Sequence, residues 1–416
     1  MFNGLKSKFY KLLRWSQQYT QTDMVYIAKG GFWLSLGQII SIFASFLLAV
    51  AFANLLNPTV YGTYKYILSW IGILGIFSLN GINTAVTQSV ARGLENSFYT
   101  GFKTKLKWGI LGSLGALGLA GYYWWQGNPT LPIPLLISAI FLPLVNASGI
   151  YGEFLLGKKL FNFRMKYSTA SYLLSVLFLI LTVFLTKNLF WLIAVYLISN
   201  TLLGYIFYLI TQIKFKPNRN DDPQTISYGK HLSLMGVIST VASYIDQILL
   251  FTFIGSTQVA IYSFASAVPE KIKEILQNIN TLALPKLAAK SREEIKKGLK
   301  RKLYQLTILT IAVMAVYFLF APYIYQIFFP KYLAAVPYSK VLTLIFITYP
   351  ASFITMVFQA KMMKRELYFL NSVNPIVQII LLLTLTPLFG IWGVVGAIIS
   401  TKIFSLIFTL FLARKI

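Results

Sequence analysis

The chain has 416 residues, of which 57% are hydrophobic and only 12% are charged. A soluble domain carries about 25% charged residues, so this chain has too little polarity for a water-facing surface and is expected to be a membrane protein. Its 37 Lys and Arg residues outnumber 11 Asp and Glu residues, for a net charge of +26. Membrane proteins collect such charge in cytoplasmic loops, so we expect membrane lipids as partners and no nucleic acid. The lack of cysteine excludes disulfides, thiolate metal sites and a cysteine nucleophile.

Residues 1–28 are basic and aromatic and lack the apolar core of a signal peptide. We expect this segment to lie at the cytoplasmic interface of the membrane. The rest of the chain contains repeated apolar stretches of about 20 residues, the length that crosses a bilayer core of about 30 Å. They predict an all-α integral membrane protein with about twelve spans, near 30–53, 66–90, 108–125, 133–156, 167–186, 189–212, 232–253, 258–286, 303–326, 337–360, 367–387 and 391–413.

The basic residues alternate with these spans. Thirty of them fall in the segments of one side, which are 1–29, 91–107, 157–166, 213–231, 286–302, 361–366 and 414–416. The loops of the other side are short and hold only Lys65, Lys187, Lys331 and Lys340. A missed or extra span would destroy this alternation. By the positive-inside rule, both termini are predicted to be cytoplasmic, in an inner, or cytoplasmic, membrane.

The two halves of the chain resemble each other. Thr59 and Tyr64 align with Thr257 and Tyr262, and the sequence Ile-Asn-Thr at 82–84 recurs at 279–281. The offsets of 198 and 197 residues correspond to six helices. We therefore expect two six-helix bundles related by a pseudo-two-fold axis along the membrane normal, with a substrate site between them. The predicted parts are a bundle at 29–213, a cytoplasmic linker at 214–231 and a bundle at 232–416.

The middle of the eighth span is charged. Its polar residues fall on one helical face or its flank: Glu270, Lys271, Lys273, Glu274, Gln277 and Asn280. A charge at the bilayer centre costs about 2.5–3.5 kcal/mol on insertion scales and usually faces water. We therefore predict that this face lines an aqueous cavity and that Lys271 or Lys273 contacts the substrate. Two alternatives remain: the i,i+3 pairs Glu270–Lys273 and Lys271–Glu274 only neutralise each other, or residues 263–281 lie partly outside the membrane.

Other polar residues in the spans give weaker signals. Asp246 lies on a polar face of the seventh span and is a candidate for coupling to a proton or cation, although a structural hydrogen bond explains it as well. Asn83 and Arg92 lie toward the cytoplasmic end of the second span, where they could hold an anionic headgroup, while Arg92 is also an ordinary membrane anchor. Lys402, midway along the last span, is expected to snorkel or to pair with a neighbour. The sequence has no nucleotide-binding loop, and no cofactor or metal is expected.

Three stretches resemble motifs of polysaccharide exporters. The first is the loop Asn57-Pro58-Thr59-Val60-Tyr61-Gly62-Thr63-Tyr64, and the second is Gln88-Ser89-Val90-Ala91-Arg92-Gly93. The third comprises Asp246-Gln247-Ile248-Leu249-Leu250, Gly255 through Tyr262, and Pro285-Lys286-Leu287. With them the chain resembles the oligosaccharide flippases (Wzx-type, polysaccharide transport branch) of the multidrug/oligosaccharidyl-lipid/polysaccharide exporter superfamily.

This resemblance implies a transporter of the cell envelope, as in O-antigen or other polysaccharide biosynthesis. A polyprenyl-pyrophosphate-linked glycan would be taken from the cytoplasmic leaflet and released outside by alternating access. Lys271 and Lys273 fit the cavity cations that attract the pyrophosphate. The partners are then the lipid-linked glycan and membrane lipids, with a glycan polymerase or glycosyltransferases as further candidates.

Two rival functions remain open. A cation-coupled drug or metabolite antiporter of the same fold would need one acidic residue in a compact site, for which Asp246 is the candidate. A membrane-embedded glycan polymerase, ligase or acyltransferase would need a large outer loop or a His/Asp motif. The sequence contains neither feature, so we do not expect an enzyme.

Overall fold

A computed structural model describes residues 24–281, 287 and 292–413. Residues 1–23 of the predicted interfacial segment lie outside this range, so the location of that segment stays a prediction. The described chain consists of α-helices with three short 3-10 segments, η1 to η3, and contains no β-strand. The prediction of an all-α protein is therefore confirmed.

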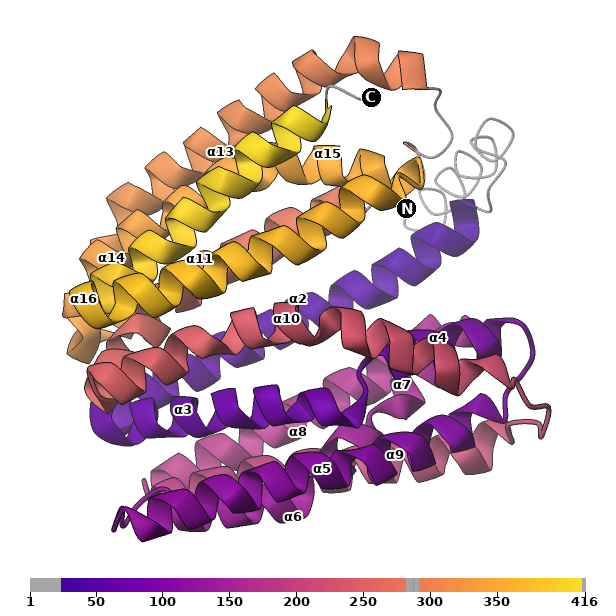
Figure 1. The fold of residues 1–416 in the computed structure, drawn as a ribbon, viewed down its shortest axis with the longest axis horizontal. Coiled ribbons are helices and arrows are strands. Elements are labelled where there is room, and N and C mark those ends of the chain that lie inside the picture. The colour runs from indigo at the N-terminus through magenta and orange to yellow at the C-terminus, as the bar shows by residue number, and fades with distance from the viewer. Residues whose placement is uncertain (1–23, 282–286, 288–291, 414–416) are drawn as a thin grey trace, which may run out of the picture.

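The first half of the chain forms long helices that run in alternating directions (Figure 1). The segment η1 joins α3 to α4, and α7 continues α6. The bounds are α2 (Met24–Leu55), α3 (Pro58–Leu74), η1 (Gly75–Ser78), α4 (Gly81–Ala91), α5 (Ser97–Trp125), α6 (Pro132–Ser148), α7 (Ile150–Gly157), α8 (Phe161–Leu185) and α9 (Leu189–Phe215).

The second half repeats this plan with a more irregular tenth crossing, which is divided into short helices. Its bounds are α10 (Gln224–Phe253), α11 (Ser256–Thr281), α13 (Arg292–Phe328), η2 (Pro330–Ala335), α14 (Val336–Leu342), η3 (Thr343–Thr348), α15 (Tyr349–Ala360) and α16 (Lys364–Ala413).

The described helices agree with about twelve membrane crossings. Eight segments are long and apolar enough to span a membrane, and α3 with η1 and α4, bent by 49°, makes a ninth. One of the eight, α16, reverses at Gly390, where φ is +58°, a conformation that glycine adopts without strain. Asn374 Nδ2 on its first arm donates to Ser405 Oγ on its second arm at 2.9 Å. α5 and α11 are less apolar but have the length of spans, 29 and 26 residues.

The helices pack into two bundles, which diverge toward one end of the molecule (Figure 1). In the first bundle, α2 packs on α8, and α6 packs on α5 and α9. In the second bundle, α16 packs on α10 and α15, and α11 packs on α14. α10 also packs on α3 and α4 of the first bundle, and Ser233 Oγ accepts a hydrogen bond from Gly81 N at 2.9 Å. The exact domain boundaries therefore stay a prediction.

The connections between helices define two ends. We call the end with 92–96, 158–160, 216–223 and 361–363 the basic end, because most of the predicted basic segments lead into it. The end with 56–57, 126–131, 186–188, 254–255 and Gly390 is called the opposite end.

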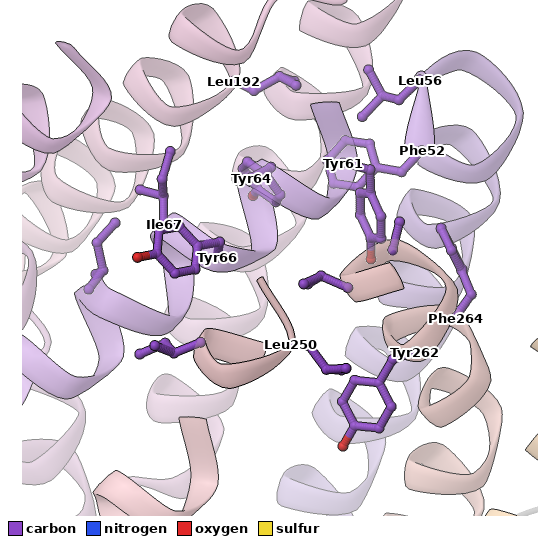
Figure 2. Close-up of a cluster of buried hydrophobic side chains, with 14 of the residues drawn as sticks. Phe52, Leu56, Tyr61, Tyr64, Tyr66, Ile67, Leu192, Leu250, Tyr262 and Phe264 are labelled. Atoms are coloured by element: carbon purple, nitrogen blue, oxygen red, sulfur yellow. The ribbon is translucent and has the colours of Figure 1, made fainter. Parts of the chain in front are cut away.

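The two bundles meet near the opposite end in a cluster of aromatic side chains, which we call the aromatic seam: Phe52, Tyr61, Tyr64, Phe264 and Phe329. Figure 2 shows four of these residues, with Tyr61 beside Phe264. The rings of Tyr61 and Phe264 stack with centroids 4.6 Å apart, and Phe264 also packs against Phe329 at 5.4 Å. Each such side chain contributes roughly 1.5–3 kcal/mol when fully buried. The seam therefore holds the bundles together at this end.

Backbone contacts reinforce the seam. A Cβ added to Gly62 would lie 1.7 Å from the carbonyl oxygen of Ser256, so α3 and α11 cross more closely than any side chain at this position would permit. Asn54 Nδ2 donates to Phe328 O at 3.0 Å, and Lys331 Nζ donates to Asn54 O at 2.6 Å. The opposite end is therefore closed in this structure.

Candidate functional site

A cavity of about 610 Å³ lies between the bundles, next to the aromatic seam. We call it the inter-bundle cavity. One wall is apolar and comes mainly from α2, with Ile39, Ile42, Phe43 and Phe46. The polar wall comes from α3, α10 and α11, with Lys65, Gln247, Ser263, Ser266, Glu270 and Lys271. The cavity therefore combines an apolar side with charges from both bundles, as expected for the space between two transporter halves.

Lys65 corrects one sequence expectation. We expected it in a loop of the opposite end, but it lies about two turns into α3 and lines the inter-bundle cavity. The reason is the helix start: Asn57 caps α3 by accepting from Thr59 N at 3.0 Å, and Pro58 occupies the first turn. This Asn-Pro signal was visible in the sequence. Lys65 forms no ion pair or hydrogen bond with a described residue.

The charged middle of α11 faces two different spaces. Lys271 lines the inter-bundle cavity, whereas Lys273 lines a second cavity inside the second bundle. Residues two positions apart on a helix point in directions that differ by about 200°, so these lysines cannot lie on one side of α11. Glu270 is exposed and lines both cavities. The sequence placed Lys273 on the polar face and Lys271 on its flank, and in the structure the two lysines line different cavities.

The i,i+3 pairs expected on α11 form only in part. Lys271 Nζ donates to both carboxylate oxygens of Glu274 at 3.0 Å. Glu270 and Lys273 form no ion pair within the described residues. Mutual neutralisation therefore explains the pair Lys271–Glu274. The charges of Glu270 and Lys273 remain without an ion pair among the residues described and border the cavities. Gln277 and Asn280 lie on α11, but their side chains are outside the described part of the structure.

The second cavity, of about 220 Å³, lies between α10, α11, α14 and α16, and we call it the bundle cavity. Its charged lining consists of Asp246, Glu270, Lys273 and Lys402. Asp246 Oδ2 accepts from the buried Tyr262 hydroxyl at 2.6 Å, and its Oδ1 accepts from Gln247 N at 2.8 Å. Both carboxylate oxygens thus have protein donors, which supports the structural explanation of Asp246, while its role in ion coupling stays a prediction.

Asn83 and Arg92 lie apart from these cavities. Asn83 Oδ1 accepts from the buried Lys105 Nζ at 2.7 Å, inside the first bundle. Arg92 is ion-paired with Asp222 at the basic end, beside a separate pocket of about 510 Å³. A hydrogen bond from Ser89, helped by the charge of Arg92, lowers the pKa of Asp222. The structure thus gives both predicted headgroup ligands partners within the protein.

Among the residues that the structure describes, no group of three His, Asp or Glu side chains could hold a metal ion. The charged centre is instead made of ammonium and carboxylate groups in enclosed, partly apolar spaces. Such an arrangement can bind a charged solute without water around it, because fixed charges act more strongly there than in bulk solvent.

Solved structures share the fold of this chain. The inward-facing conformation of a multidrug resistance MATE family transporter of the MOP superfamily is similar to this chain with a TM-score of 0.71 and 14% identity, over 92% of this chain and 97% of that one. The lipid II flippase MurJ in an inward closed conformation gives 0.69 and 16%, over 91% and 87%. The chain has the fold of these membrane transporters.

The sequence identifies the family within that class. Residues 27–288 match the polysaccharide biosynthesis protein family, and the chain belongs to it. No curated protein matches the chain. The family match and the shared fold agree with the resemblance to polysaccharide exporters and with the expectation of a transporter rather than an enzyme.

Proposed function

We propose that this protein is a flippase that moves a polyprenyl-pyrophosphate-linked oligosaccharide from the cytoplasmic to the outer leaflet of the cell membrane by alternating access. One observation carries the proposal: Lys65 from the first bundle and Lys271 from the second bundle line the same cavity. An O-antigen precursor is one member of this substrate class.

The two lysines suit a diphosphate. Ammonium groups on different bundles attract an anion between them, and binding then depends on the distance between the bundles. A diphosphate held between the bundles therefore has different affinities for the inward-open and outward-open conformations, as alternating access requires. The side chains of Lys271 and Glu274 are 37% and 40% exposed. An ion pair with this exposure contributes at most about 1 kcal/mol, so a diphosphate can replace Glu274 at little cost.

The apolar wall suits the prenyl chain. Ile39 and Phe43 on α2 are 65% and 63% exposed, and Ile275 on α11 is 49% exposed. All three line the inter-bundle cavity. A substrate can then keep its hydrocarbon chain along these side chains and in lipid, while its headgroup and sugars enter the cavity. This removes the cost of several kcal/mol for each glycan hydroxyl that would otherwise cross hydrocarbon without a partner.

The basic loops indicate which end of the transporter faces the cytoplasm. By the positive-inside rule the basic end faces the cytoplasm, as do both termini. The bundles diverge toward the basic end and are joined at the opposite end, so this conformation is suited to loading from the cytoplasm (Figure 1). Release outside then requires the aromatic seam to open and the basic end to close.

The rival antiporter predicts a different site. It needs a free carboxylate in a compact cavity, and Asp246 would supply it. Both oxygens of Asp246 accept hydrogen bonds from the protein, however, and two lysines share its cavity. Glu270 also lines this cavity and forms no ion pair with a described residue, so the choice of the flippase rests on Lys65 and Lys271 rather than on the lack of a free carboxylate.

The test is the double variant Lys65→Gln with Lys271→Gln in cells that depend on this protein for glycan export. We expect lipid-linked glycan to accumulate in the cytoplasmic leaflet and export to fall at least tenfold, with normal protein levels in the membrane. Lys187→Gln is the matched control, because Lys187 lies in a loop at the opposite end, away from the cavity. Full export by the double variant would disprove the role of these lysines.

A further inference from the structure

A third, smaller cavity of about 80 Å³ lies beside the bundle cavity, deeper in the second bundle. Two lysines from different helices line it: Lys273 on α11 and Lys402 on the second arm of α16. Both lysines also line the bundle cavity, so their side chains border both spaces. The lining of the small cavity contains no carboxylate.

The expected partners of these lysines do not contact them. Neither Lys273 nor Lys402 forms an ion pair or hydrogen bond with a described residue. Both oxygens of Asp246 are used by Tyr262 and the backbone, and Glu270 also borders the inter-bundle cavity. The expectation that Lys402 pairs with a neighbour is therefore not met among the described residues.

The hydroxyl groups around the small cavity also donate elsewhere. Thr348 Oγ1 donates to Ile345 O at 2.7 Å, and Tyr349 donates to Leu276 O at 2.8 Å. Ser352 Oγ donates to Tyr349 O at 2.6 Å. The ammonium groups are thus the free N–H donors of this lining, and they carry like charges that repel each other in an enclosed space.

We propose that Lys273 and Lys402 bind one small inorganic anion of the size of chloride between them. A single negative charge at this place replaces a repulsion with two attractions. A space of about 80 Å³ next to the bundle cavity leaves room for such an anion together with a water molecule.

This anion would connect α11 with the second arm of α16 and so stabilise the second bundle next to the inter-bundle cavity. The inference concerns the packing of that bundle and does not depend on the transported substrate. A failure of the anion test would leave the proposed flippase activity untouched, and the reverse also holds.

The experiment measures the melting temperature of the purified full-length protein in sodium chloride, bromide, phosphate and gluconate at constant ionic strength. We expect chloride and bromide to raise Tm in a saturable way by about 2 °C or more over gluconate. Phosphate should have no more effect than gluconate, because the proposed site takes an anion of the size of chloride. Lys273→Gln and Lys402→Gln should each abolish the halide effect.

Lys271→Gln is the matched control, since it removes an ammonium group from the same helix but from another cavity. It should keep the full halide effect. A bromide-soaked crystal should show anomalous density between the Nζ atoms of Lys273 and Lys402, a result that requires no variant to fold. The proposal is overturned if wild-type Tm is the same in all four salts, if phosphate matches the halides, or if bromide binds elsewhere.

Discussion

Two helices, α3 and α11, contribute to both the aromatic seam and the inter-bundle cavity, but with opposite chemistry. Within the first three turns of these helices, Tyr61 stacks on Phe264, and Gly62 lies against the backbone of Ser256. Farther along, the helices present Lys65 and Lys271 to the cavity. The two helices approach closely where Gly62 meets Ser256. The contact point therefore determines the conformation, and the separated part leaves its charges available to a ligand.

The largest expected effect comes from breaking the contact point. Gly62→Val should prevent closure of the opposite end, because the added Cβ alone would lie 1.7 Å from Ser256 O. The chain has no cysteine, so Asn54→Cys with Phe328→Cys can report closure by cross-linking with a short bismaleimide. We expect Gly62→Val to lower the cross-linking rate at least tenfold and to abolish export.

Gly118→Val controls for the loss of a helical glycine. Gly118 lies in α5, and an added Cβ there would meet nothing within 4 Å. It should leave both cross-linking and export unchanged. Normal cross-linking in Gly62→Val would mean that closure does not need this helix crossing.

A smaller effect is expected at the edge of the seam. Lys331→Met removes the ammonium group that donates to Asn54 O at 2.6 Å and to Leu56 O at 3.4 Å. Hydrogen bonds to charged groups contribute about 1.5–3 kcal/mol when buried, and less at this exposed site. We expect the same cross-linking rate to fall by about three- to tenfold. Lys187→Met, at the same end of the molecule, should have no effect, and an unchanged rate in Lys331→Met would remove Lys331 from the closure.

Much of this architecture was predictable from the sequence. Apolar length and the alternation of basic residues predicted about twelve crossings, because both follow from the thickness and asymmetry of a membrane rather than from contacts between helices. The charges of α11 also predicted a cavity, because Glu270, Lys271 and Lys273 are too costly to expose to lipid.

The composition of the cavity was less predictable. Lys65 was assigned to a loop because hydropathy ignored the Asn57 cap, which moves the start of the helix to Pro58. The partner of Asn83 is Lys105, which belongs to another helix, and no local pattern indicates such a pairing. Helical geometry placed Lys271 on the flank of the face that holds Lys273, but which cavity each one lines depends on how α11 packs.

The smallest expected effect concerns ligand binding in the inter-bundle cavity. Glu274→Gln should release Lys271 from its ion pair without changing the aromatic seam. If Lys271 binds a diphosphate, the variant should bind farnesyl diphosphate more tightly, by at most about fivefold, the limit for an exposed ion pair. Titration of the purified protein measures this change. In the Lys271→Gln background the same substitution should have no effect, because the competing carboxylate then has no lysine to hold. Weaker binding in Glu274→Gln would mean that this carboxylate contacts the ligand itself, and the cavity would then select its load by more than the attraction of two lysines for phosphate.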